Sequence, residues 1–228
     1  GHRVPVTVHV TPVRDAEGQI IGALEVFSPH SMHGQMTEEI LSLREQILRL
    51  APQAAEAEQE LLNLRQQAYT DPLTGLANRR YGEQIIEQHL HLLRERKRPI
   101  GIIFFDIDHF KHFNDTYGHA TGDQVLRAVS QSLLNILRRS DTLCRWGGEE
   151  FLVLAPNVEE KSLLRLAERA RIFVQHSFLV INDQQVSITA SFGATMATPE
   201  DSPALLVERA DALMYQSKQN GRNRITFA

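Results

Sequence analysis

Four acidic side chains mark the ends of two apolar, strand-like segments. Asp106 and Asp108 close the stretch IGIIFFDID, and Glu149 and Glu150 open the stretch EEFLVLAP. If these strands are neighbours in a sheet, their carboxylates meet at one end of it. Two unit charges ~4 Å apart repel by ~4 kcal/mol at an effective dielectric near ~20, and a divalent cation would offset that repulsion. Oxygen ligands without cysteine or histidine suit Mg²⁺ or Mn²⁺.

The four acids are not equivalent. Side chains alternate along a strand, so the adjacent Glu149 and Glu150 are expected to point to opposite sides and to have different roles. Acids also gather at strand ends because loops are polar. For Asp108 taken alone, that plain explanation is the preferred one.

The glycine pair Gly147-Gly148 directly precedes the two glutamates. Glycine leaves the backbone bare, which lets a bulky ligand approach closely and reach the N–H groups. The same pair also suits the tight turn of a hairpin. The pair therefore fits both a ligand site and a simple structural turn.

Cationic and amide side chains flank the acids along the chain. Lys111 supplies a positive charge, and Asn114 with Asp123 offers an amide and a carboxylate that together can read the edge of guanine. Asp123 equally suits the cap of the helix that follows. Lys218 and Arg222 surround a later helix end, where they either hold a polyphosphate or complement the helix dipole.

The segment that carries these residues, about 70–228, alternates between strand and helix patterns. This alternation predicts a central sheet covered by helices. The expected strands are 100–108, 143–146, 151–154, 186–194 and 224–227, and the expected helices are 123–138, 158–178 and 203–220.

The first 30 residues read as a β-hairpin. Valines alternate over residues 4–10, a turn follows at 15–18, and a second strand is expected at 20–27. A lone hairpin is only marginally stable, so it needs the rest of its domain or another chain as a partner. The pattern resembles the last two strands of a PAS sensor domain.

Residues 34–69 read as one helix with an apolar heptad. The pattern favours a parallel coiled coil, and a helix packed on its own domain is the alternative. Pro52 lacks a backbone N–H, so it is expected to kink or break the helix near residues 48–52. The residues at the a and d positions are Ile40, Leu43, Ile47, Leu50, Ala54, Ala57, Leu61, Leu64 and Ala68.

The composition is that of a globular protein, with 42% hydrophobic and 23% charged residues among 228. The net charge of −4 gives no excess of positive charge that would indicate binding to nucleic acid or to an anionic membrane. The single cysteine excludes an intramolecular disulfide and is typical of a reducing cytosol. No run approaches the roughly 20 apolar residues that a membrane span needs, so a cytoplasmic location without membrane contact is expected.

Four motifs together resemble the GGDEF family of diguanylate cyclases. They are GGEEF at 147–151, DPLTGLANRR at 71–80, FFDIDHFKHFNDTYGHATGD at 104–123 and KQNGRNR at 218–224. The resemblance implies an α+β fold with a five-stranded mixed sheet wrapped by helices, as in nucleotidyl cyclases. The chain then divides into a PAS-like end (1–30), a coiled-coil linker (31–69) and a cyclase domain (70–228).

The resemblance also implies a reaction, in which two GTP condense into cyclic di-GMP and two pyrophosphates. Asp106, Glu149 and the carbonyl of Ile107 match the ligands of Mg²⁺ or Mn²⁺. Glu149 matches the base for the attacking hydroxyl, with Glu150 assisting. The remaining matches are nucleotide contacts, among them the guanine-reading pair and the phosphate-binding cations: Phe110, Lys111, Asn114, His119, Asp123, Gly147, Gly148, Lys218 and Arg222.

The motif RRSD ends five residues before Gly147, the first glycine of GGEEF, and matches the RxxD inhibitory site of the family. Arg138 and Asp141 would bind the product, with Arg169 as a secondary contact. Arginine can form paired hydrogen bonds to a phosphate or to the edge of guanine. The reaction implies a homodimer, held here by the helical stalk. The alternatives are a degenerate module that only binds cyclic di-GMP, and a related cyclase with another cyclic product.

Overall fold

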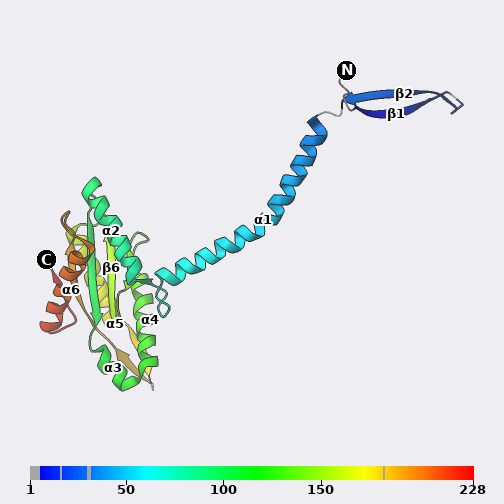
Figure 1. The fold of residues 1–228 in the computed structure, drawn as a ribbon. Coiled ribbons are helices and arrows are strands. Elements are labelled where there is room, and N and C mark those ends of the chain that lie inside the picture. The colour runs from blue at the N-terminus through cyan, green and yellow to red at the C-terminus, as the bar shows by residue number, and fades with distance from the viewer. Residues whose placement is uncertain (1–5, 16, 30–31, 182) are drawn as a thin grey trace. The chain divides into compact units, whose positions relative to one another are not determined.

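The computed structural model describes residues 6–15, 17–29, 32–181 and 183–228 (Figure 1). The chain separates into two compact units, Gly1–Asn63 and Leu64–Ala228. Each is described by itself.

The first unit contains an antiparallel hairpin of β1 (Val6–Arg14) and β2 (Ile20–Pro29), which confirms the expected hairpin. Its turn is ordered by Asp15, whose carboxylate accepts hydrogen bonds from the backbone N–H groups of Glu17 and Gln19. Val4, at the start of the expected first strand, lies outside the described residues. The valines that alternate along β1 are exposed, so the described residues of this unit provide no apolar cover for them.

The helix α1 (Met32–Tyr69) follows the hairpin and extends from the first unit into the second. It continues through Pro52, so of the expected kink or break the break is not present, whereas Figure 1 shows a bend part-way along the helix. Pro52 has no N–H to donate to the carbonyl of Leu48. Several apolar residues of the heptad are exposed along α1: Leu43, Ile47, Leu50, Leu61 and Leu64. An exposed apolar stripe of this kind is what a coiled coil requires, and the coiled coil stays a prediction.

The second unit is built on a mixed sheet in the order β10-β9-β4-β6-β5-β3. The outer pairs β10–β9 and β3–β5 are parallel, and the inner pairs are antiparallel. The sheet has six strands where five were expected, because the short β3 pairs with β5. The strands are β3 (Ala77–Asn78), β4 (Ile100–Ile107), β5 (Thr142–Arg145), β6 (Glu150–Pro156), β9 (Ala190–Met196) and β10 (Ile225–Phe227).

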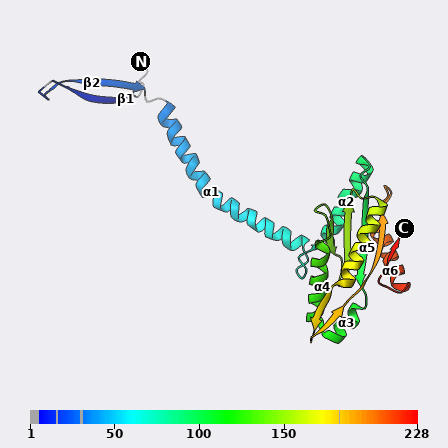
Figure 2. The ribbon, with the colours of Figure 1, turned by 180° about the vertical axis from the view of Figure 1, so that it is seen from behind.

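Helices cover both faces of this sheet, and the central strand β4 is buried along its whole length. Alternate β4 residues such as Ile102 and Phe104 pack against α2 (Arg79–Arg96) and α6 (Pro203–Gln219). Their neighbours Ile103 and Phe105 join the larger core beneath α4 (His119–Leu134) and α5 (Glu160–His176). Figure 2 shows α5 on the face opposite α6.

Several elements differ from the expectation. The helix α2 was not foreseen, and the segment after β4 contains a further helix, α3 (Phe110–Tyr117), where a loop was expected. Gly118, with φ of 84°, separates α3 from α4, which begins four residues earlier than expected. The expected strand 186–194 is divided, because its first residues pair in a separate hairpin of β7 (Phe178–Ile181) and β8 (Gln184–Ser187).

The helix α6 packs unusually close to the sheet. A Cβ atom on Gly193 of β9 would overlap the backbone of α6 at Ala210 and Met214, so glycine is required there. Ser217 of α6 donates a hydrogen bond to the carbonyl of Phe192, with Oγ and O 2.7 Å apart. These contacts fix the end of α6 against β9. None of the helices in the described part of the chain has the length and apolarity to span a membrane.

Candidate active site

The predicted acids meet at one end of the sheet. In the antiparallel pair β4–β6, Asp106 lies directly opposite Glu150. The N–H of Ile107 donates to the carbonyl of Glu149, at an N–O distance of 3.3 Å, and so brings Glu149 beside the end of β4. The expectation that these two strands are neighbours is therefore confirmed.

The electrostatics of this end favour a cation. The pKa values of Asp106, Glu149 and Glu150 are all raised, first because the groups are partly buried and then because nearby carboxylates repel them. Lys218 on α6 offsets part of this charge, with its Nζ 2.7 Å from Asp106 Oδ1. The negative charge of the cluster is thus only partly balanced by the protein itself.

The donor chemistry of the cluster fits a hard divalent cation. Within the described ranges, no group of three or more acidic, histidine or cysteine side chains is arranged to hold a metal ion. Mg²⁺ is usually bound through one or two carboxylates, with waters and substrate phosphates completing its shell, so a preformed cage is not required. Asp106, Glu149 and the carbonyl of Ile107 remain the predicted ligands.

Asp108 connects the end of β4 to the neighbouring loops through hydrogen bonds. Its carboxylate accepts hydrogen bonds from Ser191 Oγ at 2.6 Å, Thr189 Oγ1 at 2.7 Å and the N–H of Asn223 at 3.1 Å. Asn223 and its neighbour Arg222 both have positive φ, of 46° and 59°. Asp108 is buried and anchors the turn that carries the predicted phosphate-binding Arg222, so it has a more specific role than that of an acid in a polar loop.

The two glycines of the GGEEF turn have different surroundings. Neither Gly147 nor Gly148 has a positive φ, so the turn does not depend on glycine for its backbone conformation. A Cβ atom on Gly147 would overlap the carboxylate of Glu150, which folds back over it, whereas the space beside Gly148 is open. The expectation of bare backbone open to a ligand therefore holds at Gly148, while at Gly147 the space is filled by Glu150.

The predicted guanine-reading residues lie on consecutive helices. Asn114 is on α3, and its Oδ1 is buried without a hydrogen-bond partner within the described residues. Asp123 lies inside α4, whose capping position is Gly118, so the interpretation of Asp123 as the helix cap is wrong. Phe110 is buried in the core beside Gly122, and His119 is exposed as the first residue of α4.

The predicted cations differ in how closely they approach the acids. Lys218 forms the ion pair with Asp106 described above. Lys111 on α3 and Arg222 after α6 are both exposed. Their contacts with phosphate stay predictions.

The predicted inhibitory residues surround one cavity. Arg138, Asp141 and Arg169 line a hollow of about 210 Å³ between the end of α4 and α5. The N–H of Arg138 donates to Asp141 Oδ2 at 2.9 Å, which forms a tight local turn, and Arg169 donates to the carbonyl of Ile136. Two residues from one turn and one from a separate helix thus line the same cavity, and the binding of product there stays a prediction.

A larger cavity of about 760 Å³ lies on the α2–α6 face of the sheet. Of the predicted site residues, only Glu150 lines it, together with Phe104, Trp146 and Asp211. The cavity therefore reaches the acidic cluster from the side away from Asn114 and Asp123.

Comparison with known families decides the assignment. The model of the family described as "Diguanylate cyclase, GGDEF domain" matches residues 68–224, which include the acidic cluster, the two guanine-reading candidates and Lys218. The chain belongs to the GGDEF family.

Several relatives and solved structures of GGDEF proteins resemble the chain. Diguanylate cyclase A of Treponema denticola is 35% identical over 217 residues, which is 93% of this chain and 57% of that protein. The response regulator PleD of Caulobacter vibrioides is 40% identical over 161 residues, or 69% of this chain and 36% of PleD. The chain thus spans 57% and 36% of the length of these two relatives.

The crystal structure of the coiled coil and GGDEF domain of DgcB from Caulobacter crescentus, in complex with c-di-GMP, also resembles the chain. Its TM-score is 0.76 at 33% identity, and the match covers 82% of this chain and all of that one. This likeness confirms the α+β GGDEF fold with its mixed sheet.

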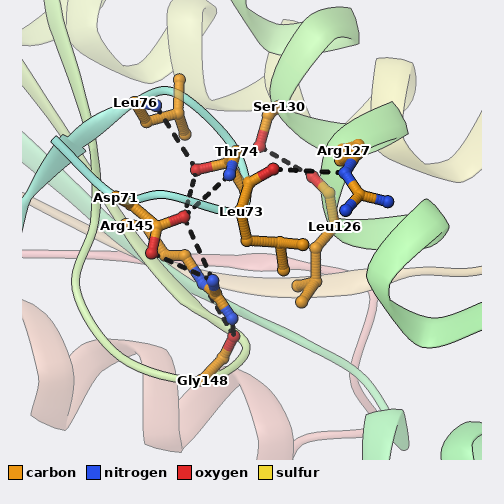
Figure 3. A network of polar contacts seen from close by, with 9 residues as sticks. All are labelled: Asp71, Leu73, Thr74, Leu76, Leu126, Arg127, Ser130, Arg145 and Gly148. Carbon is orange, nitrogen blue, oxygen red and sulfur yellow. Dashed lines mark hydrogen bonds and ion pairs between the residues drawn. The ribbon is translucent and has the colours of Figure 1, made fainter. Parts of the chain in front are cut away.

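The GGDEF domain contains one polar network that motif reasoning missed (Figure 3). Arg145, just before the GGEEF turn, pairs with Asp71 and donates to the carbonyl of Gly148. The stretch DPLTGLANRR was used only as a family marker, although an acid in a turn-rich loop and an arginine beside a glycine pair were both visible in the sequence. Nothing in their separation of 74 residues indicated that they meet.

The contact between Gly122 and Asn114 makes a testable prediction. In a Gly122→Ala variant the new methyl group would overlap Asn114 Oδ1, and the amide would rotate away because it is the free end of a side chain. If Asn114 reads guanine, as the family resemblance predicts, the loss of that hydrogen bond corresponds to about a tenfold rise in KM for GTP, with little change in kcat. Steady-state kinetics measure both values.

A control for this variant is Gln131→Ala, which changes an exposed residue of α4 two turns further along the helix. The KM of this control should equal that of the parent chain. A Gly122→Ala protein with an unchanged KM would mean that Asn114 does not contact the base.

Proposed function

We propose that this chain is a diguanylate cyclase that joins two GTP molecules into cyclic di-GMP and releases two pyrophosphates. The observation that carries the proposal is the meeting of Asp106, Glu149 and Glu150 at one sheet end, with Lys218 paired to Asp106. A partly balanced acidic cluster with an adjacent cation suits a metal-assisted reaction on a triphosphate. The relatives named as diguanylate cyclases support the same reaction.

Each GGDEF domain holds one GTP in this proposal. The buried Oδ1 of Asn114 lacks a donor, and the edge of guanine supplies N–H donors that would satisfy it. The carboxylate of Asp123 accepts a further hydrogen bond from the base. Lys218 and Arg222 neutralise the pyrophosphate as it leaves, and Lys111 adds a third positive charge on α3.

Glu149 acts on the attacking group. Its raised pKa, caused by burial and by Asp106, makes it a better proton acceptor than an ordinary glutamate. Glu149 takes the proton of the 3′-hydroxyl, the oxygen bonds to the α-phosphorus, and the bond to the pyrophosphate breaks. A bound Mg²⁺ or Mn²⁺ would lower the pKa of this hydroxyl and neutralise charge on the α-phosphate.

The reaction needs two domains. Because each GTP provides one 3′-hydroxyl and one α-phosphate, two half-sites must face each other around a two-fold axis. The exposed apolar stripe of α1 supports a homodimer in which paired stalks raise the effective concentration of the two half-sites.

Product analysis tests the proposal directly. The chain is incubated with GTP or with ATP in the presence of Mg²⁺, and the products are separated by chromatography. The expected result is cyclic di-GMP from GTP alone. Binding of cyclic di-GMP without turnover would replace the cyclase by the degenerate binding module, and another cyclic product would reassign the substrate.

Product inhibition through the cavity at Arg138 and Asp141 is a further part of the proposal. The variant Arg138→Ala loses a charge-assisted contact to the product, which corresponds to about a 10- to 100-fold weaker inhibition. The inhibition constant of added cyclic di-GMP measures the effect. Lys161→Ala, which removes an exposed cation from α5 outside the cavity, serves as control. Equal inhibition of both variants would exclude this cavity.

A further inference from the structure

The side chain of Arg145 connects two segments that lie far apart in the sequence. Its Nη1 lies 3.1 Å from each carboxylate oxygen of Asp71. Its Nε and Nη2 donate to the carbonyl of Gly148, at 3.1 and 2.8 Å. Figure 3 shows the guanidinium between the two partners. The planar fork of arginine satisfies both at once, which a lysine ammonium on one flexible stem cannot reproduce.

The pair of Asp71 and Arg145 is sheltered and well satisfied. Each side chain is 16% exposed. Asp71 also accepts hydrogen bonds from the N–H and hydroxyl of Thr74, which orders the loop itself. Burial alone would raise the pKa of Asp71, but these hydrogen bonds and the charge of Arg145 outweigh it and the pKa is lowered. The carboxylate is therefore a stable anchor at neutral pH.

On its other side, Arg145 acts on the backbone that carries the proposed base. Gly148 directly precedes Glu149, whose own carbonyl accepts from the N–H of Ile107. Glu149 therefore lies between two held peptides: Arg145 binds the Gly148 carbonyl of the preceding peptide, and Ile107 at the end of β4 binds the Glu149 carbonyl of the following one. A shift of the Gly148 carbonyl would move Glu149 relative to Asp106.

The anchor of Arg145 is attached to the end of α1. Asp71 follows Tyr69, the last residue of that helix, by two positions. The carbonyl of Ala68 accepts a hydrogen bond from Asn78 Nδ2, and Asn78 is the pairing partner of Arg145 between β3 and β5. The segment after the stalk therefore reaches Arg145 both through Asp71 and through Asn78.

We propose that Arg145 is a positioning residue, which holds the Gly148 carbonyl, and through it Glu149, at a place set by the segment that follows α1. The proposal rests on the proposed function, since it is the reaction of Glu149 that would depend on this position. It adds a physical connection between the end of the stalk and the GGEEF turn.

The first experiment compares Arg145→Lys, Arg145→Gln and Asp71→Asn in steady-state kinetics with GTP. A displacement of a reacting group by about 1 Å can cost on the order of 100-fold in rate. The expected result is a fall in kcat of about 10- to 100-fold with KM for GTP changed less than about threefold, because the guanine-reading residues lie on α3 and α4. Arg145→Lys should retain more activity than Arg145→Gln.

A double-mutant cycle tests whether Asp71 acts through Arg145. If it does, Asp71→Asn in an Arg145→Gln background should lower kcat little further, because residues that act as a unit are not additive. The control is Arg127→Gln, which removes a hydrogen bond to the carbonyl of Leu73 in the same loop without touching the turn. This control should keep the parent kcat. Multiplicative losses in the double variant, or an equal loss in the control, would overturn the proposal.

Trp146 gives a measurement that does not depend on turnover. It is the only tryptophan of the chain and stands between Arg145 and Gly147. Its intrinsic fluorescence therefore reports on the hairpin itself. Acrylamide quenching of Trp146 is expected to increase in Asp71→Asn and Arg145→Lys and to stay unchanged in Arg127→Gln, with retained binding of cyclic di-GMP as evidence of folding.

The outcomes separate the two proposals. If the parent chain makes no cyclic di-GMP, the cyclase assignment fails, and the quenching data alone decide whether the turn is held by Arg145. If Arg145→Lys does not fold, Asp71→Asn carries the test. A lower melting temperature with unchanged kcat and unchanged quenching would reduce the network to a purely structural one and overturn the positioning role.

Discussion

Replacement of Glu149 by alanine is expected to reduce cyclic di-GMP synthesis by about 10²- to 10⁴-fold, the range that general base catalysis contributes. Glu149 has a raised pKa beside Asp106, and its carbonyl is tied to the end of β4. The alanine variant would lose both the proton acceptor and one predicted metal ligand. Product formation at saturating GTP and Mg²⁺, measured by chromatography, gives the rate.

Two controls make this result specific. Glu200→Ala removes an exposed acid outside the cluster and should leave the rate unchanged. Binding of cyclic di-GMP by Glu149→Ala should persist, because Arg138 and Asp141 lie around a separate cavity. A Glu149→Ala protein that retains most of the parent rate would assign the base to another group.

The second large effect is expected from Leu61→Asp on α1. Leu61 is 50% exposed in the single chain and stands at a predicted seam position, where a buried carboxylate would oppose pairing of two stalks. If the stalk raises the effective concentration of half-sites, its loss should lower activity at nanomolar enzyme by about 10²-fold. Activity per chain is measured across a dilution series.

The dilution series separates weak association from a damaged site. The activity of Leu61→Asp should recover as the enzyme concentration rises, since the half-sites themselves are intact. Glu58→Gln, an exposed change off the seam, should behave as the parent chain. Unchanged activity of Leu61→Asp at nanomolar enzyme would exclude the stalk from the mechanism.

The acidic end of the sheet could be predicted because two independent signals coincide there. An uninterrupted apolar run such as residues 100–105 is typical of a strand buried on both faces, and like charges at its end need a partner of opposite charge. The structure confirms β4 as the buried centre of the sheet, with Asp106 opposite Glu150. Charge and periodicity are both local properties, so the sequence displays them directly.

Other elements of the fold have no local sequence pattern from which they could be predicted. The strand β3 has two residues, too few for any alternation, and it forms only because β5 offers a free edge. The helix α3 has eight residues, shorter than a pattern with period 3.6 needs for detection. The early start of α4 depends on Gly118, whose positive φ closes α3 and opens the next helix.

The finer features of the site depend on contacts over long separations. Asp71 and Arg145 are 74 positions apart, and neither loop pattern indicates that they meet. The unpartnered Oδ1 of Asn114 and the overlap of Glu150 with Gly147 are properties of packing. Residue types and motifs predicted which side chains take part, whereas their mutual support follows only from the tertiary structure.

The close seating of α6 against β9 divides the proposed nucleotide site into two walls of different stiffness. Gly193 and Ser217 lock one wall, which carries Lys218, into the core, so it has little freedom to adjust. The other wall is the GGEEF turn, where the exposed Gly148 is held by hydrogen bonds from Arg145 and not by close packing in the core. Any change in the shape of the proposed nucleotide site is therefore expected to move the glutamates of the GGEEF turn, while Lys218 on α6 keeps its position.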